Sequence, residues 1–331
     1  MKQKFALLSC VKTPEEIPVK LNIIKKMPIL DWYVHKFNPY KAERLIILQE
    51  EGYKIKLPLT EQELASDPKK ATYIIDRTMG SLKDYGVSVA MLPRYYNVKQ
   101  QDTDIKIATG KDMLPFVIMD AIVNALDILQ KELKLANIVI LGDSDYAENF
   151  IRNIYPEVNF LSVLTNIPSY KYDGLADEIF HDTGLNIQIS KISKNALSNA
   201  DIIIDTSYKD EKFDFCFKRG AVYFNFSGNK EKSASLISKR DDMLIVDDLK
   251  VRCRDVGTAW SMPYFELIFF TKSRDYRYIL SRGYNVYRGK LLKKQLSRLG
   301  VSHASYMQLG QTLNNLQLKY FFARSGITID N

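Results

Sequence analysis

The sequence has too few cysteines and histidines for a disulfide framework or a clustered metal site. Its three cysteines, Cys10, Cys216 and Cys253, are far apart and odd in number, which is typical of a protein from a reducing compartment. Its three histidines are scattered, and no pair has metal-ligand spacing. We therefore predict no bound metal, and we interpret these cysteines and histidines as packing residues.

Long apolar runs are also missing. The apolar run in "MKQKFALLSC" is too short for the core of a signal peptide and is typical of a first strand. The most apolar stretch, "MLPFVIMDAIVNALDIL", is interrupted by Asp120, Asn124 and Asp127, so it does not have the pattern of a membrane span. We therefore expect a cytoplasmic protein.

The size and charge of the chain set further bounds. Its 331 residues are enough for two domains, and a hydrophobic share of 46% suits sizeable cores. The formal net charge of +8 permits a nucleotide, a nucleic acid or an anionic surface as a partner. The net charge does not distinguish among these partners, because lysines on a solvated surface without any partner give the same positive charge.

The N-terminal third alternates between strand and helix patterns. "KFALLSC", "YKIKLPL" and "VSVAMLP" predict strands, and "KKATYIIDRTMGSLKDYG" predicts a helix that ends at Gly86. The apolar residues expected on one side of this helix are Tyr73, Ile74, Ile75, Met79 and Leu82. We predict an α/β substrate-type domain over residues 1–108, followed by a buried connecting helix over residues 109–135.

A second α/β domain is predicted over residues 136–250. Six apolar, β-rich runs are separated by helical patterns: "NIVILG", "NFLSVLT", "LNIQIS", "ADIIIDTS", "AVYFNFS" and "MLIVDD". Uninterrupted runs of this kind predict a parallel sheet covered on both faces, and right-handed crossovers make it a doubly wound, Rossmann-like sheet. In the first helix, Ala147, Phe150, Ile151 and Ile154 share one face.

Residues 251–331 read as a helical, basic extension that packs back on the domains. Its last helix is expected to begin after Ser302 as cap and to end before Gly326. From residue 272 to 298 there are nine Lys or Arg residues and one acid, and Tyr276, Tyr278, Tyr284 and Tyr287 lie among them. Arginines among tyrosines can hold single-stranded nucleic acid. An amphipathic helical pair with inward tyrosines is the interpretation we favour, so nucleic acid is not the expected partner.

The turn after the first strand of the second domain suggests a dinucleotide site. Such sites use three glycines, for a tight turn, for backbone approach to the pyrophosphate and for close helix packing. Gly142, Ser144 and Ala147 occupy these places. Asp143 and Asp145 add negative charge where the pyrophosphate would lie, which is unfavourable. A working cofactor site and a plain strand–turn–helix therefore both remain open.

The ends of two other strands indicate which cofactor would bind. NAD sites place an acid at the end of the second strand, but this strand ends at Thr165 and Asn166, and Lys171 follows. These residues favour NADP over NAD. Thr206 and Ser207 end the fourth strand and are expected near the ribose on the nicotinamide side.

Four segments resemble the shikimate dehydrogenases and the related acyl-(acyl-carrier-protein) reductases over about residues 1–250. They are "ATGKDMLPF", "ANIVILGDSDYAENFI", "ALSNADIIIDTS" and "RGAVYFNFSGN". The resemblance implies an N-terminal substrate domain, a connecting helix and an NADP-binding Rossmann domain. It also implies that Asp112 works with a lysine, for which Lys20 and Lys111 are the candidates, and that Asn166 opens the motif that selects NADP.

The chain departs from both families in residues that carry chemistry. The arginine that follows the asparagine in the NADP-selecting motif is replaced by Ile167. The reductases' nucleophilic cysteine precedes the fifth strand, where this chain has Arg219, Gly220 and Ala221. Cys216 lies a few residues earlier, so a thioester mechanism is not expected.

These observations lead to one functional hypothesis and one alternative. The hypothesis is an NADP-dependent oxidoreductase that acts on a small or acyl carbonyl or hydroxyl substrate in an interdomain cleft, with Tyr95 and Tyr96 lining the substrate pocket. Asp112 with Lys111 or Lys20 would move the proton, although Asp112 also suits a helix cap beside Thr109. The alternative is an inactive Rossmann protein that senses a ligand or contacts a partner through residues 272–298. Homodimer formation is left open.

Overall fold

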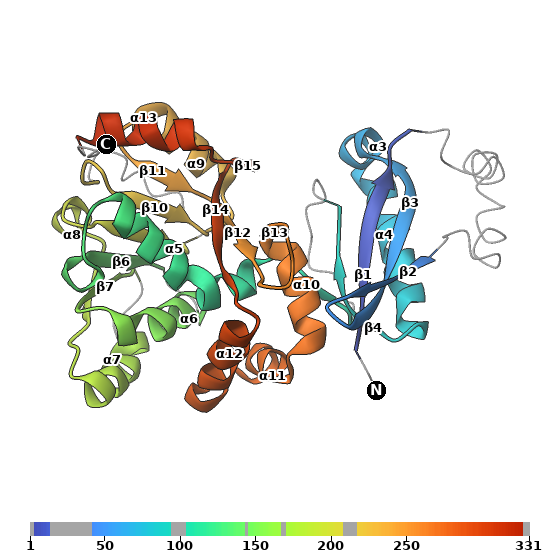
Figure 1. The fold of residues 1–331 in the computed structure, drawn as a ribbon, viewed down its shortest axis with the longest axis horizontal. Coiled ribbons are helices and arrows are strands. Elements are labelled where there is room, and N and C mark those ends of the chain that lie inside the picture. The colour runs from blue at the N-terminus through green and yellow to red at the C-terminus, as the bar shows by residue number, and fades with distance from the viewer. Residues whose placement is uncertain are drawn as a thin grey trace. The chain divides into compact units, whose positions relative to one another are not determined.

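The computed structural model describes residues 3–13, 42–93, 104–142, 145–166, 170–207 and 217–326. The chain forms two compact units (Figure 1). Unit 1 comprises residues 1–110 and 263–292, and unit 2 comprises residues 111–262 and 293–331. The chain therefore leaves unit 1, builds most of unit 2, returns to unit 1 and ends in unit 2.

Unit 1 is built around a five-stranded mixed sheet in the order β2-β3-β1-β4-β5. Strand β1 pairs in parallel with β3 and β4, and β2 forms an antiparallel hairpin with β3. The elements of this unit are β1 (Lys4–Val11), β2 (Ala42–Ile47), β3 (Glu50–Thr60), α3 (Glu61–Ser66), α4 (Pro68–Asp84), β4 (Val87–Met91), β5 (Lys106–Ile107), α10 (Met262–Lys272), α11 (Arg274–Arg282) and the first half of α12 (Val286–Arg298).

Helix α4 shows how the local sequence sets an element in this unit. The Asp67 side chain caps its first turn by accepting from the amide of Lys70 at 3.1 Å, and Pro68 occupies the first helical position. The helix was predicted correctly, and Ile75, Met79 and Leu82 are buried as expected. Tyr73 was wrongly placed on that face: it is 45% exposed, and the guanidinium of Arg77 lies over its ring.

Unit 2 contains a six-stranded sheet in the order β11-β10-β9-β6-β7-β8, and every pair is parallel. The elements up to its last strand are η3 (Lys111–Met113), α5 (Leu114–Ile128), η4 (Leu133–Leu135), β6 (Asn137–Leu141), α6 (Asp145–Ile154), η5 (Tyr155–Glu157), β7 (Phe160–Leu164), α7 (Tyr170–Thr183), β8 (Gln188–Ser190), α8 (Lys194–Ser198), β9 (Ile202–Asp205), β10 (Val222–Asn225), α9 (Lys230–Lys239) and β11 (Leu244–Val246).

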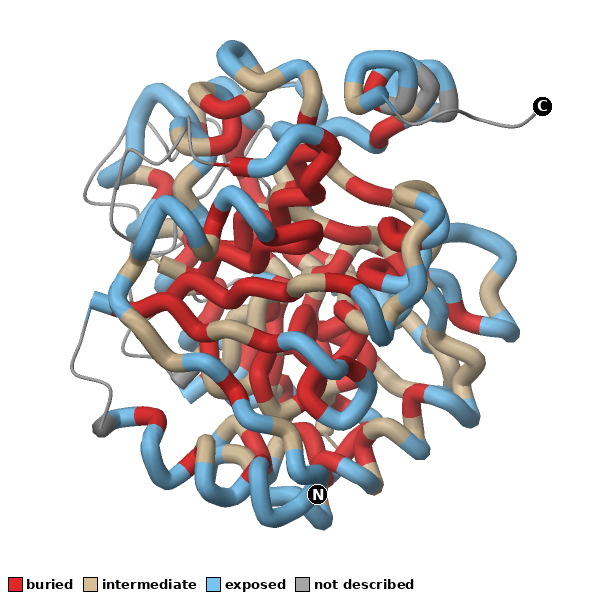
Figure 2. The backbone as a smooth tube through the Cα atoms, turned by 90° about the vertical axis from the view of Figure 1, so that its left-hand side faces the viewer, coloured by how far each residue is buried: buried red, intermediate tan, exposed pale blue. Residues whose placement is uncertain are grey.

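This sheet confirms the predicted α/β class. Numbered in chain order, its strands run 3-2-1-4-5-6, the order of dinucleotide-binding folds. All six predicted strands are present. Every residue of β9, β10 and β11 is buried, whereas β8 is exposed or half-buried, and buried segments gather toward the centre of Figure 2. The predicted face of α6 is buried as well: Ala147, Phe150, Ile151 and Ile154 are each 0% exposed.

The segment predicted as one connecting helix is shorter and interrupted. It consists of η3, α5 and η4, and α5 ends at Ile128 because Leu129 leaves the helical conformation and Gln130 has φ of 51°. Helix α5 packs against α6 and β14 and is buried on several sides, as its apolar pattern predicted. No helix in the described part of the chain combines the length and the apolar character of a membrane span.

The C-terminal region contains a small antiparallel sheet that the helical interpretation missed. Its four strands lie in the order β13-β12-β14-β15, and the elements are β12 (Asp248–Arg252), β13 (Trp260–Ser261), β14 (Ser302–Gln308), β15 (Gln311–Thr312) and the final helix α13 (Asn315–Ser325). The prediction that Ser302 caps the last helix is wrong. A turn at Gly310, with φ of 80°, separates β14 from β15, and Asn314 caps α13 through the amide of Gln317.

A buried carboxylate holds the amino end of the six-stranded sheet. Asp201 is 3% exposed and accepts from the amide of Asn137 at 2.9 Å, from Lys218 at 2.6 Å and from Lys131. Burial alone would raise the pKa of Asp201, but the hydrogen bonds from the two lysines outweigh it and lower the pKa. The carboxylate therefore stabilises the fold above the ordinary pKa of an aspartate, and this contribution is lost as the pH falls through the lowered value.

Asp201→Asn is expected to lower the free energy of unfolding at neutral pH by about 2 kcal/mol, because it leaves the lysines and a buried amide poorly paired. The difference from the wild type should shrink below about pH 4. Urea denaturation at neutral pH and below about pH 4 measures this difference in the free energy of unfolding. The control is Asp241→Asn, since Asp241 and its partner Arg324 are 69% and 56% exposed and such a pair is worth at most about 1 kcal/mol. Equal losses in both variants would contradict this role of Asp201.

Candidate functional site at the carboxyl edge of the six-stranded sheet

The strand order reverses at the carboxyl ends of β6 and β9. These strands are paired neighbours, and the chain proceeds from them to opposite sides of the sheet, to β7 and β8 on one side and to β10 and β11 on the other. The crossovers therefore diverge at this point. Open α/β sheets bind their ligands at such a position.

Gly142 follows the last residue of β6 and lies against Thr206, which follows the last residue of the neighbouring strand β9. A Cβ atom at this position would lie 2.0 Å from Oγ1 of Thr206 and 3.1 Å from Cβ of Ala147. Thr206 is 1% exposed, and its hydroxyl donates to the carbonyl of Leu141 at 2.8 Å. The close packing of β6, β9 and α6 therefore requires a glycine here. In a dinucleotide-binding motif, the first position allows a tight turn and the third allows the helix to pack closely.

The helix after the second strand supports the same turn. Tyr172 in α7 is 0% exposed, and its hydroxyl donates to the carbonyl of Gly142 at 3.1 Å. Of the residues that suggested NADP, Thr165 is buried, whereas Asn166 and Lys171 are exposed at the end of β7 and the start of α7. Tyr172 was missed by sequence reasoning, because no local pattern shows that a helix residue will reach a turn thirty positions earlier.

A buried polar cluster shapes the end of β9. Asp205 is 0% exposed and accepts from the hydroxyl of Tyr223 and from the ammonium group of Lys232, whose side chain is 11% exposed. The other oxygen of Asp205 accepts from the amide of Ser207 at 2.8 Å. The turn that holds Thr206 and Ser207 is thus fixed by a charged pair from β9 and α9. No local pattern in the sequence pairs Asp205 with Lys232, because they are 27 positions apart.

Lys111 reaches the turn after β10. A Cβ atom on Gly228, which has φ of 84°, would lie 2.3 Å from Nζ of Lys111. The turn itself is rigid, because the side-chain amide of Asn225 donates to the carbonyl of Asn229 and the hydroxyl of Ser227 donates to Asn225. Burial lowers the pKa of Lys111, and the charge of Asp112 opposes this shift in part. The ammonium group of Lys111 is therefore held at the carboxyl edge of the sheet.

The structure brings some of the candidate site residues together, and other candidates lie outside the described residues. Gly142, Ala147, Thr206 and Ser207 lie at the ends of β6 and β9 and the start of α6, and Lys111 lies beside the turn after β10. Asp112 follows Lys111 in η3 and is half-buried. The candidates Lys20, Tyr95, Tyr96, Asp143 and Ser144 lie outside the described residues, as do Cys216 and Ile167.

Cys10, Cys253 and His303 have the properties of packed side chains. Burial raises the pKa of both Cys10 and Cys253 to about 11, so each thiol stays protonated at neutral pH. His303 lies in β14, with its ring centroid 4.3 Å from that of Tyr306. Burial lowers the pKa of His303 to about 4, so its imidazole is neutral at pH 7.

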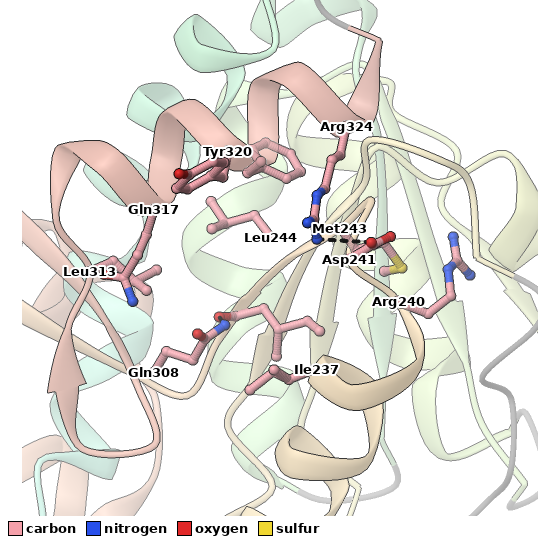
Figure 3. Close-up of a pocket in the computed structure, with 12 residues that line it drawn as sticks. Ile237, Arg240, Asp241, Met243, Leu244, Gln308, Leu313, Gln317, Tyr320 and Arg324 are labelled. Carbon is pink, nitrogen blue, oxygen red and sulfur yellow. Dashed lines mark hydrogen bonds and ion pairs between the residues drawn. The ribbon is translucent and has the colours of Figure 1, made fainter.

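A separate cavity of about 320 Å³ lies between α13 and the edge strand β11 (Figure 3). Leu244, Leu313 and Phe321 line it together with polar side chains, and the ion pair between Arg324 and Asp241 lies on its wall. This cavity flanks the outermost strand of the sheet and not the carboxyl ends of β6 and β9. We therefore do not include it in the candidate site.

Comparisons with known proteins yield similar folds only. Neither the protein-family models nor the curated proteins contain a match to this sequence. Among solved structures, an L-tryptophan dehydrogenase from Nostoc punctiforme is 13% identical, with 98% of this chain and 88% of that chain covered and a TM-score of 0.38. A shikimate dehydrogenase in complex with NADP+ is 11% identical, with 90% and 96% covered and a TM-score of 0.34.

A putative malic enzyme is 15% identical, with 67% of this chain covered and a TM-score of 0.30, and the chain spans only 59% of that protein. These sequence identities and TM-scores are too low to assign a function to this chain.

Gly142→Ala is expected to lower the free energy of unfolding by about 2 kcal/mol, because its methyl group overlaps the Thr206 hydroxyl. Adding Thr206→Ala removes the overlapping oxygen, so the double variant should be more stable than the sum of the two single losses predicts. Urea denaturation of the four proteins gives the coupling energy, which we expect to exceed about 1 kcal/mol. Additive losses would show that this contact does not determine the turn.

Proposed function

We propose that the protein is an NADP-dependent oxidoreductase that reduces a small carbonyl substrate, or oxidises the corresponding alcohol, at the carboxyl edge of the six-stranded sheet. The observation that carries this proposal is the 3-2-1-4-5-6 parallel order, with Gly142 at the turn where such sheets bind a pyrophosphate. Helix α6 begins at Asp145, three residues after Gly142, and the amide groups at the start of a helix favour a bound phosphate.

The residues present fit a dinucleotide at this turn. Gly142 has no Cβ, and the adjacent side chains of Thr206 and Ala147 are small. Amide groups at the start of a helix and its partial positive charge favour a bound phosphate. The pyrophosphate would therefore bind at the start of α6, and the nicotinamide side would extend toward Ser207 and the turn after β10.

The choice of NADP rests on the end of β7. An acid at this position would bind the ribose hydroxyls of NAD and repel a 2′-phosphate. This chain has Thr165 and Asn166 there, and the exposed Lys171 opens α7 nearby. A cation near the adenosine ribose favours the phosphorylated cofactor, because the phosphate is doubly charged at neutral pH.

Lys111 is the group we assign to proton transfer. Bound NADPH supplies a hydride to the carbonyl carbon of the substrate. The ammonium group of Lys111 gives its proton to the carbonyl oxygen, which leaves a hydroxyl on the product and a neutral amine that regains a proton from water. The lowered pKa of Lys111 makes its ammonium group a stronger acid at neutral pH. The negative charge of the adjacent Asp112 opposes this lowering of the pKa in part.

NADPH is expected to raise the melting temperature of the protein by about 5–10 °C at roughly 100 times its dissociation constant, and NADH by less. Differential scanning fluorimetry with both nucleotides measures this. Lys171→Glu should reduce the NADPH shift to that of NADH and leave the NADH shift unchanged. Absence of a shift with either nucleotide would contradict the proposal and favour a Rossmann protein without a nicotinamide cofactor.

Lys111→Gln is expected to lower NADPH-dependent carbonyl reduction about 100-fold, which is the usual contribution of a general acid. The assay follows NADPH absorbance over a panel of small 2-oxo acids, ketones and aldehydes. The NADPH-induced rise in melting temperature should remain, because Lys111 acts on the substrate. The exposed Lys134, which precedes β6 at the opposite edge of the sheet, provides the control Lys134→Gln. Equal activity of both variants would exclude Lys111 as the acid.

A further inference from the structure

The net charge of the chain is concentrated in one short segment. Residues 272–298 contain nine basic and one acidic residue, a net charge of +8. The entire chain, with 47 basic and 39 acidic residues, also has a formal net charge of +8. The other 304 residues are therefore neutral overall. A basic composition spread over the surface would not produce this distribution, so the segment requires an explanation of its own.

The four tyrosines of this segment divide into two inward and two outward side chains. Tyr276 is 0% exposed and donates its hydroxyl to the buried Glu266 at 2.8 Å. Tyr284 packs against Gly289, where a Cβ atom would lie 2.3 Å from its hydroxyl oxygen. Tyr278 and Tyr287 are 42% and 66% exposed. An amphipathic helical pair with inward tyrosines therefore accounts only for Tyr276 and Tyr284.

One face of α11 carries a tyrosine between two arginines. Arg274, Tyr278 and Arg282 are spaced four residues apart, so they share one side of the helix, and all three are exposed. Arg274 and Arg282 form no ion pair with the described residues. Arg277 lies on another side of α11 and donates to the carbonyl of Thr271 at 2.9 Å. It thereby satisfies a carbonyl group in the last turn of α10. Its charge has a structural role that those of Arg274 and Arg282 lack.

The start of α12 continues this surface. The guanidinium of Arg288 lies 5.0 Å from the ring centroid of Tyr278 and 6.0 Å from that of Tyr287, and Asp275 holds it by an ion pair. Arg288 therefore joins the exposed tyrosine of α11 to that of α12. Lys290 is exposed three residues after Tyr287 and forms no ion pair with the described part of the chain.

We propose that this surface, the tyrosine–arginine stripe, binds single-stranded nucleic acid. The stripe consists of Arg274, Tyr278, Arg282, Tyr287, Arg288 and Lys290. Unpaired bases would stack on the two exposed rings, and the exposed cations beside them would pair with phosphates. The only acid of the segment, Asp275, is 7% exposed and already paired, so little negative charge on these two helices opposes a phosphate backbone.

The positions of the rings favour single strands over other anionic partners. A duplex hides the faces of its bases, so it would meet the cations and leave the tyrosines unused. An anionic membrane binds most firmly when bulky apolar groups enter it, whereas the exposed aromatic groups here are tyrosines with Arg288 between them. This proposal is independent of the oxidoreductase activity, since the stripe belongs to unit 1 and the cofactor site to unit 2.

Fluorescence anisotropy with labelled rU20 and dT20 oligonucleotides and the full chain tests the proposal. If the stripe neutralises about three phosphates, raising the salt from 50 to 200 mM should weaken binding roughly 20-fold. Preference for rU20 or for dT20 would distinguish RNA from DNA, and either result supports the proposal.

Two types of variant separate stacking from charge. Tyr287→Ala should weaken binding roughly 5-fold or more without changing the salt dependence, because it removes a stacking ring. Arg282→Ala should weaken binding and make the salt dependence less steep by about one phosphate. The controls are Tyr320→Ala in α13 and Arg252→Ala in β12, which remove an exposed tyrosine and an exposed arginine outside the stripe.

Several results would overturn the proposal. They are absence of binding at 50 mM salt, equal weakening by the stripe and control variants, tighter binding of a duplex of the same length, and weakening of heparin binding by Tyr287→Ala as large as the weakening of rU20 binding, because heparin has no bases that could stack on the ring. Tighter binding to vesicles that contain phosphatidylserine would replace the nucleic acid by a membrane surface. Circular dichroism of each variant confirms that α11 and α12 still fold.

Discussion

The contact between Gly142 and Thr206 is the constraint on which the rest of the candidate site depends. It lets β6 and β9 lie side by side up to their carboxyl ends, because no side chain separates the backbone of one strand from the hydroxyl of the other. Ala147 of helix α6 packs against the same point. A larger residue at position 142 would push apart the two strands whose carboxyl ends form the candidate site.

Two buried aspartates stabilise the sheet, one at the amino ends of its strands and one at their carboxyl ends. Asp201 joins the amino ends of β6 and β9 to lysines from neighbouring segments, and Asp205 joins the carboxyl end of β9 to β10 and α9. Each accepts from several donors, which offsets the loss of hydration. The second cluster fixes Ser207 at the carboxyl end of β9, so the polar network that stabilises the sheet also positions the turn where a ligand would bind.

Sequence reasoning predicted the six strands and the buried face of α6 because both depend on local apolar patterns. It failed where tertiary pairing decides. The stretch from Ser302 to Gln308 became the strand β14 because β12 pairs with it, although Gly310 and Asn314 marked the turn and the helix cap. Likewise, no spacing in the sequence shows that Lys232 meets Asp205, that Tyr172 meets Gly142, or that Lys111 lies over Gly228.

The proposed oxidoreductase activity requires the carboxyl ends of β6 and β9 to bind a dinucleotide phosphate. A crystal structure of the protein with NADPH tests this most directly. We expect pyrophosphate density at the first turn of α6, beside Gly142, with the nicotinamide ring directed toward Ser207 and Lys111. Density for the nucleotide in the cavity beneath α13, or a first turn of α6 filled by side chains of the protein, would contradict it.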